Sequence, residues 1–142
     1  MSPSRAPRTA AARGTGRRKA AAAPRRKNPL TESRKICLAL PETTEKVAWG
    51  APTFRVKDKI FAMFTANHHG DGRIALWCNA PPGAQEELIG SDPVHFFRPA
   101  YVGPRGWVGV RLDGTLDWGV IAMIVLEAYK TTAPKRLAAL VG

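Results

Sequence analysis

The sequence has few of the features that mark membrane-bound, secreted or disulfide-stabilised proteins. It contains no run of about 18 apolar residues, so no segment is expected to span a membrane. The N-terminus has no apolar core of the kind that a secretory signal needs, which favours a cytoplasmic location. The two cysteines, Cys37 and Cys78, form no C-x-x-C pair and have apolar neighbours. Buried thiols are therefore expected, although the sequence leaves a disulfide between them open.

The signatures of common catalytic sites are also missing. The sequence has no P-loop, no dinucleotide-binding glycine pattern, no H-E-x-x-H and no nucleophile elbow. His68 and His69, with Asp71, come nearest to a metal or acid–base cluster, but they fall in a polar turn where the sequence sets no geometry. Cys78 is expected to be a structural thiol rather than a nucleophile. We therefore expect no catalytic activity, no cofactor and no bound metal.

Acidic residues are absent from residues 1–29, which hold nine of the 22 basic residues. The other 13 basic residues face 11 acidic ones, so residues 30–142 carry only +2 of the net charge of +11. Small residues and prolines separate the charges of residues 1–29 and supply little apolar surface, so this segment is predicted to be disordered in isolation. We interpret it as a basic tail that binds phosphates. Alternatives are a solvated tail, an over-long start site and a transit peptide.

The pattern of residues 30–142 predicts one domain with helices at both ends of the chain and strands between them. The first helix is expected from Thr31, as N-cap, to Leu40, because Pro41 follows. Strands are expected around residues 47–49, 61–65, 74–78, 94–97 and 107–112, with a short helix over residues 84–89. A helix over residues 118–130, apolar almost all round, is expected to lie buried across the sheet, and a short helix follows Pro134.

The segment from Trp49 to Phe64 predicts a β-hairpin with a tight turn at Lys57 and Asp58. The apolar residues Phe54, Val56, Ile60, Ala62 and Phe64 share one parity, which places them on one face of the hairpin. With the flanking helices, these strands indicate an α+β domain in which helices pack on one face of an antiparallel sheet.

Several segments resemble the MmcQ/YjbR family, in the right order over about residues 31–138. They are Leu40–Glu42, Trp49–Val56, Lys59–Ala62, Gly106–Leu112 and Ala133–Lys135. The resemblance implies a CyaY-like (frataxin-like) α+β fold and DNA binding through two wings. The family often has a glycine pair at the hairpin turn, where this chain has Lys57 and Asp58. An iron surface of the frataxin type needs a dense acidic ridge, which the first helix does not supply, since it offers Glu32 alone.

The sequence therefore predicts a monomeric DNA-binding protein that contacts phosphates without strong sequence preference. The candidate first wing is the hairpin tip, residues 55–59, and the candidate second wing is the loop of residues 98–106. The candidate DNA-binding residues are Arg17, Arg18, Lys19, Arg25, Arg26 and Lys27 in the tail and Arg55, Lys57, Lys59, Arg98, Arg105, Trp107, Arg111 and Lys135 in the domain. The alternative is a small-ligand or protein-interaction domain without catalytic activity.

Overall fold

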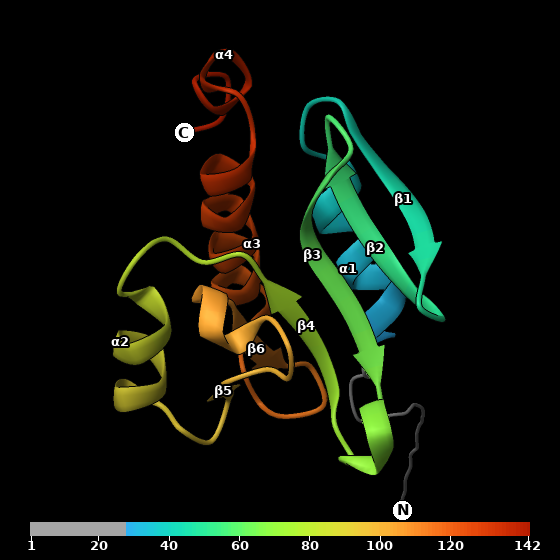
Figure 1. Cartoon of the computed structure of the whole chain (residues 1–142), viewed down its shortest axis with the longest axis vertical. Coiled ribbons are helices and arrows are strands. Elements are labelled where there is room, and N and C mark those ends of the chain that lie inside the picture. Colours follow the sequence, from blue (N-terminus) through green and yellow to red (C-terminus); the bar gives the residue numbers. More distant parts are fainter. Residues whose placement is uncertain (1–27) are drawn as a thin grey trace, which may run out of the picture.

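The computed structural model describes residues 28–142, which form a six-stranded antiparallel sheet with helices (Figure 1). The order of the strands across the sheet is β1-β2-β3-β4-β6-β5. Their bounds are β1 Thr43–Ala48, β2 Ala51–Val56, β3 Lys59–Ala66, β4 Ile74–Cys78, β5 Phe96–Phe97 and β6 Val108–Arg111. Each strand from β1 to β4 pairs with the next strand in the sequence. These pairs are antiparallel hairpins, because short turns connect their strands.

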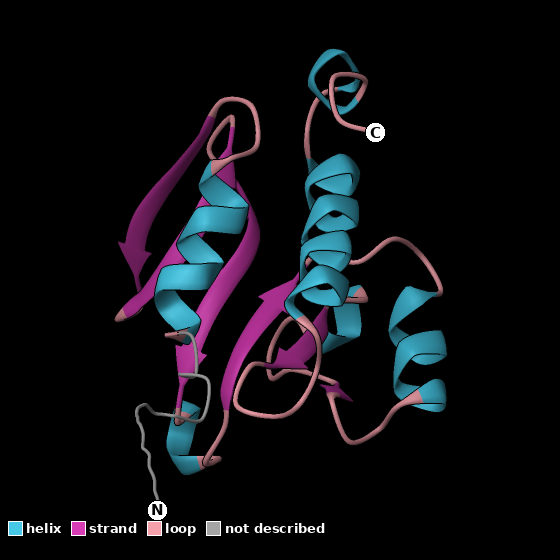
Figure 2. Cartoon of the chain, turned by 180° about the vertical axis from the view of Figure 1, so that it is seen from behind, coloured by secondary structure: helices cyan, strands magenta, loops and turns pink. Residues whose placement is uncertain are grey.

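The two longer helices cover one face of this sheet (Figure 2). These are α1 (Pro29–Leu38) and α3 (Trp118–Thr132), whereas α2 (Ala84–Ser91) lies beyond the β5 edge and α4 (Lys135–Ala138) follows α3. The main core lies between the sheet and these helices, and Phe54, Phe61 and Tyr129 are fully buried in it. The α+β fold with helices on one face of an antiparallel sheet is thereby confirmed.

The first helix begins earlier than the sequence pattern predicts. Thr31 was the expected N-cap, and this is wrong: the Asn28 side-chain oxygen accepts a hydrogen bond from the Thr31 backbone N–H at 3.1 Å. Pro29 then occupies the first turn. Its missing N–H costs nothing there, because the first N–H groups of a helix have no acceptor within the helix. Asn28 and Pro29, which the sequence pattern assigned to the tail, thus belong to the helix start. The helix ends at Leu38, two residues before the expected end.

The β2–β3 hairpin forms as expected, but one of its apolar residues lies on the other face. In its register, Phe54 pairs with Ala62 while Arg55 pairs with Ile60, so Phe61 is an extra residue in β3. This β-bulge reverses the side-chain alternation beyond it, because the two strands no longer advance together. Ile60 therefore packs on the face opposite Phe54, which corrects the parity prediction, and Phe61 takes a core position.

The helix α3 packs on the sheet as expected, but it is not buried all round. Ile121, Val125 and Tyr129 are in the core, whereas Val120 and Met123 are exposed on the side toward α2. Strand β4 has the predicted bounds, and the strand expected over residues 94–97 shortens to Phe96 and Phe97. Among residues 28–142, no helix is both long enough and apolar enough to cross a bilayer.

Candidate functional site: the open face of the sheet

The face of the sheet opposite α1 and α3, here called the open face, carries a second apolar cluster. Ala75 and Trp77 of β4 and Trp107 form its buried centre. Ile60, Met63 and Phe97 pack around them and are half-buried. The ring of Phe97 lies over Gly109, where an added Cβ would come within 2.4 Å of it. The longer helices α1 and α3 lie on the other face, whereas the loop of residues 98–106, with its short 3-10 helix Gly103–Arg105, lies on the side of this cluster and packs Val102 against it (Figure 1).

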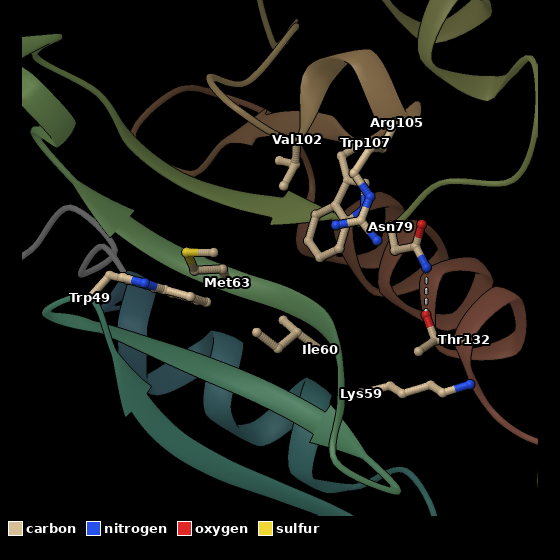
Figure 3. Close-up of a pocket in the computed structure, with 9 residues that line it drawn as sticks. All are labelled: Trp49, Lys59, Ile60, Met63, Asn79, Val102, Arg105, Trp107 and Thr132. Carbon is tan, nitrogen blue, oxygen red and sulfur yellow. Dashed lines mark hydrogen bonds between the residues drawn. The ribbon is translucent and has the colours of Figure 1, made fainter.

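A cavity of about 470 Å³ opens on this face between the hairpin and the second wing (Figure 3). The lining side chains are apolar, aromatic, amide, hydroxyl or cationic: Trp49, Lys59, Ile60, Met63, Asn79, Val102, Arg105, Trp107 and Thr132. Asn79 donates a hydrogen bond to the Thr132 hydroxyl at 2.8 Å, which ties the end of β4 to α3. Within the described part of the chain, no acidic side chain lines this cavity.

The three cations of the first wing have different surroundings. Lys57 lies in the turn and forms an ion pair of 2.8 Å with Glu42, so its charge is largely compensated. Hydrogen bonding from Lys57, and then from Arg136, lowers the pKa of the Glu42 carboxyl below its ordinary value. Arg55 donates to the Thr53 hydroxyl on the open face. Lys59 is exposed, lines the cavity and makes no ion pair with any residue in the range 28–142.

The turn of the first wing keeps its shape without glycine. Lys57 and Asp58 both have positive φ, 51° and 63°, as a two-residue type I′ hairpin turn requires. Asp tolerates this left-handed region because its short side chain can hydrogen-bond locally. The departure from the glycine pair seen in the family therefore leaves the hairpin intact.

The second wing is held in place by Gln85 of α2. The buried Gln85 amide donates to the backbone carbonyls of Gly103 at 2.8 Å and Trp107 at 2.6 Å. The Arg98 guanidinium donates to the Gln85 side-chain oxygen at 3.4 Å, and its aliphatic stem packs over Gly103. Arg105 is exposed and lines the cavity. A glutamine in a short helix gives no sequence signal for this role, so sequence reasoning missed Gln85.

The two histidines brace the other side of the second wing. His69 and the Tyr101 hydroxyl are hydrogen-bonded at 2.9 Å, and the His68 ring packs edge-on against Trp77 at 4.8 Å between centroids. The His68 Nε2 and Trp77 Nε1 atoms are buried without a partner among the described residues. In the described range, no three His, Cys, Asp or Glu side chains gather as metal ligands do. The histidines thus serve to join the β3–β4 turn to the loop.

Of the remaining predicted residues, Trp107 lines the cavity, and the others lie apart from it or outside the described range. Trp107 is 5% exposed, so only an edge of it reaches the cavity. Arg111 lies on β6 and pairs with Asp113 at 3.2 Å, and Lys135 is exposed at the start of α4. The tail residues Arg17, Arg18, Lys19, Arg25, Arg26 and Lys27 lie outside the described residues.

The residue that sequence reasoning missed on the open face is Trp49. It was expected within a strand, but it occupies the two-residue turn between β1 and β2 with a φ of 52°. Its side chain is 81% exposed and lines both the main cavity and a second cavity of about 270 Å³ beside Pro52 and His68. A Trp-Gly pair between two alternating segments was the available signal, because such pairs with glycine often form hairpin turns.

The cysteines lie in the core and not at the open face. Cys37 and Cys78 are both fully buried and free. Burial raises the pKa of the Cys78 thiol to about 12 and raises that of Cys37 well above its ordinary value. Both thiols are therefore protonated at neutral pH, whereas a nucleophilic cysteine needs an accessible thiolate.

Comparison with known proteins gives a family and a fold. A family model described as YjbR matches residues 38–131, which is more than half of the chain. A crystal structure of a Deinococcus radiodurans protein with a DUF419 domain is similar, with a TM-score of 0.62 and 22% identity. The match covers 73% of this chain and 80% of that one, and at this identity it concerns the fold alone. No curated protein matches the sequence.

Proposed function

The chain belongs to the YjbR family, and on this premise we propose that it binds DNA, chiefly through phosphate contacts of low sequence specificity. The observation that carries the proposal is the arrangement of the two wings. Lys59 of the first wing and Arg105 of the second line the same cavity, which no acidic side chain lines within the described residues. Two uncompensated cations that face a common space suit an anionic ligand that spans both wings.

The distribution of charge over the domain supports the same surface. The cations near α1 and α3 are compensated: Arg34 pairs with Glu45, Lys35 with Glu32 and Lys130 with Glu127. Arg98 and Lys59 have no such partner among residues 28–142. Lys59 and Arg105, which line the cavity, are thus among the cations without an ion pair in residues 28–142; the others are Lys46, Arg55, Arg98 and Lys135.

The tail supplies most of the positive charge in the proposal. Residues 1–29 hold no acidic residue, so the tail cations can neutralise phosphates and release counterions. We propose that the tail provides affinity, whereas the rigid wings position the nucleic acid on the domain. This division assigns no catalytic step to the protein, in keeping with its buried, protonated thiols.

The proposal is tested by neutralising the two cavity cations in the full chain. The double variant Lys59→Gln/Arg105→Gln should bind DNA about 10-fold more weakly near 0.1 M salt, and its plot of log affinity against log salt should flatten by about two units. Fluorescence anisotropy with a labelled oligonucleotide across a salt series measures both quantities.

The matched control removes the same charge from the other face. Lys35→Gln/Lys130→Gln lies on α1 and α3, where both lysines already have acidic partners. Equal losses in the two double variants would mean that only net charge matters, and the open face would then have no special role.

Glu42 is expected to restrain DNA binding, because it compensates Lys57 at 2.8 Å and Arg136 at 3.4 Å. Glu42→Gln should release both cations and steepen the salt dependence by about one to two units, with tighter binding at low salt. The control Glu87→Gln removes the same charge from α2 and breaks no described ion pair. Unchanged or weaker binding by the Glu42 variant, measured in the same anisotropy titration, would contradict a role for the first wing.

A second candidate function is small-ligand binding. The observation in its favour is the size of the main cavity, about 470 Å³, which falls within the range of small-molecule sites. Its aromatic and cationic lining suits a planar anion. A free mononucleotide that bound as tightly as an oligonucleotide would favour this function over DNA binding.

A further inference from the structure

Trp49 occupies a backbone position that disfavours its side chain and leaves that side chain in solvent. With Gly50 it forms a two-residue turn in which both φ angles are positive, 52° and 74°. Asparagine, aspartate and glycine fit the first position of such a turn, whereas a bulky residue is strained there. Trp49 gains little burial in return, because it is 81% exposed. Lys57 holds the same position in the β2–β3 turn with a φ of 51°, so the backbone alone does not mark Trp49. What distinguishes Trp49 is a large aromatic side chain that stays in solvent, which is typical of binding surfaces.

The side chain of Trp49 lies between two cavities. Its side chain forms part of the wall of the main cavity, opposite the second wing, and part of the wall of the smaller cavity beside Pro52 and His68 (Figure 3). The exposed ring faces are thus open to a flat partner. Trp107 adds an indole edge to the main cavity, and its backbone is fixed by Gln85.

The cations at this cavity match a partner that carries phosphate as well as a flat ring. Lys59 and Arg105 both line it and have no acidic partner among the described residues. Asn79 and Thr132 supply the only other polar side chains in the described lining, and they are hydrogen-bonded to each other. A planar, apolar ring bearing a negative charge therefore fits this lining, and a nucleotide has both parts.

We propose that the open face binds single-stranded DNA, with Trp49 stacked on an unpaired base and Lys59 and Arg105 in contact with the flanking phosphates. This inference rests on the proposed DNA-binding function and adds the class of substrate. Stacking on an aromatic side chain requires a base whose face is free, and in a duplex both faces are covered by neighbouring base pairs. A cavity of about 470 Å³ accommodates a molecule of the size of a nucleotide, not the width of a duplex.

A site that combines one stacking residue with cations can bind single-stranded DNA of any sequence. Every base offers a π-face, so one stacking platform accepts any base, while a cationic groove follows the backbone. The basic tail then extends the contacts to phosphates outside the cavity. We therefore expect the affinity for DNA to vary little with base sequence. It should depend strongly on whether the base that stacks on Trp49 is unpaired.

The test replaces Trp49 by asparagine in the full chain. Asparagine suits the left-handed turn, so Trp49→Asn should keep or raise the melting temperature while it removes the stacking surface. Its affinity for a labelled single-stranded oligothymidylate should fall about 5- to 150-fold, the range that corresponds to loss of one stacked base. Its affinity for a duplex of equal length should stay within about 2-fold of the unmodified chain, because tail contacts dominate there.

Two further variants separate stacking from loss of apolar surface. Trp49→Phe keeps a ring and should retain most of the single-strand affinity. Met123→Asn removes an exposed apolar side chain, 68% accessible, from α3, which lies on the other face of the sheet, and should leave both affinities unchanged.

The outcomes distinguish this inference from the function on which it rests. Unchanged single-strand affinity in Trp49→Asn, or equal losses for duplex and single strand, would overturn the stacking site while DNA binding stands. Thymidine monophosphate bound as tightly as the oligothymidylate would overturn the strand assignment in favour of a free nucleotide. Failure of the unmodified chain to bind either DNA would instead overturn the proposed function itself.

Discussion

Neutralising the tail should remove most of the salt dependence of DNA binding. If the tail and wings together contact about six to ten phosphates, the unmodified chain should lose about 10³- to 10⁵-fold in affinity between 50 and 200 mM salt. A variant with six of the nine tail cations changed to glutamine keeps the wing contacts and three tail arginines, Arg5, Arg8 and Arg13, and should lose roughly 150-fold or less over the same range. The substituted residues are Arg17, Arg18, Lys19, Arg25, Arg26 and Lys27.

The control for this variant leaves the tail charge untouched. Glutamine in place of the six alanines at residues 10–12 and 20–22 alters the same number of positions in the same segment. This control should bind as the unmodified chain does, in anisotropy titrations over the same salt series. If the charge-neutralised variant kept the affinity and slope of the unmodified chain, the tail would not be the source of affinity.

The second large effect concerns the β-bulge that sets the open face. Phe61 is fully buried and packs edge-on against Tyr129, with ring centroids 5.6 Å apart. Phe61→Ala should therefore lower the free energy of unfolding by about 3–5 kcal/mol, as large-to-small changes in a core do. Ile60→Ala removes a half-buried side chain from the cavity wall and should cost only about 1 kcal/mol.

Urea denaturation of the two variants measures the change in the free energy of unfolding. The shift in the midpoint urea concentration gives this change if the slope of free energy against urea concentration stays constant. Strict alternation along the hairpin would place Ile60 in the core in line with Ala62, and Phe61 on the other face. A larger loss for Ile60→Ala than for Phe61→Ala would therefore contradict the bulge, and with it the position of Ile60 in the cavity wall.

The strands whose side chains alternate regularly between apolar and polar residues could be predicted from the sequence. The bounds of β4 follow from a short apolar run between polar turns, and the β2–β3 hairpin follows from two alternating segments around Lys57 and Asp58. The packing of helices on one face also follows, because α1 and α3 each carry an apolar stripe that only a sheet face can bury.

The failures have physical causes that lie beyond local pattern. The bulge at Phe61 adds one residue to β3, and no glycine in the sequence marks it. The prediction from alternation therefore placed Ile60 on the wrong face of the sheet. The helix start moved to Asn28, because an asparagine before a proline caps as well as a threonine and the tail composition concealed it. Met123 stays exposed because α2 lies far enough from α3 to leave a groove between them.

The candidate site was predicted in its parts but not in its geometry. The cations of both wings, Lys59 and Arg105 among them, were named from the sequence. That they line one cavity depends on how α2 and its Gln85 position the second wing, a contact between residues far apart in the chain. The compensation of Lys57 by Glu42 is likewise a contact that sequence spacing does not reveal. Trp49 was recognised as part of a motif, but its exposure depends on the turn that it occupies.

The central claim is that the folded domain, and not the tail alone, presents a DNA-binding surface on the open face. Titration of the isotope-labelled full chain with single-stranded oligothymidylate, followed by NMR, tests it most directly. The account predicts chemical-shift changes at the Trp49 indole N–H and at the backbone amides of Lys59 and Arg105, in addition to those of the tail. Changes confined to residues 1–27, or to α1 and α3, would contradict it.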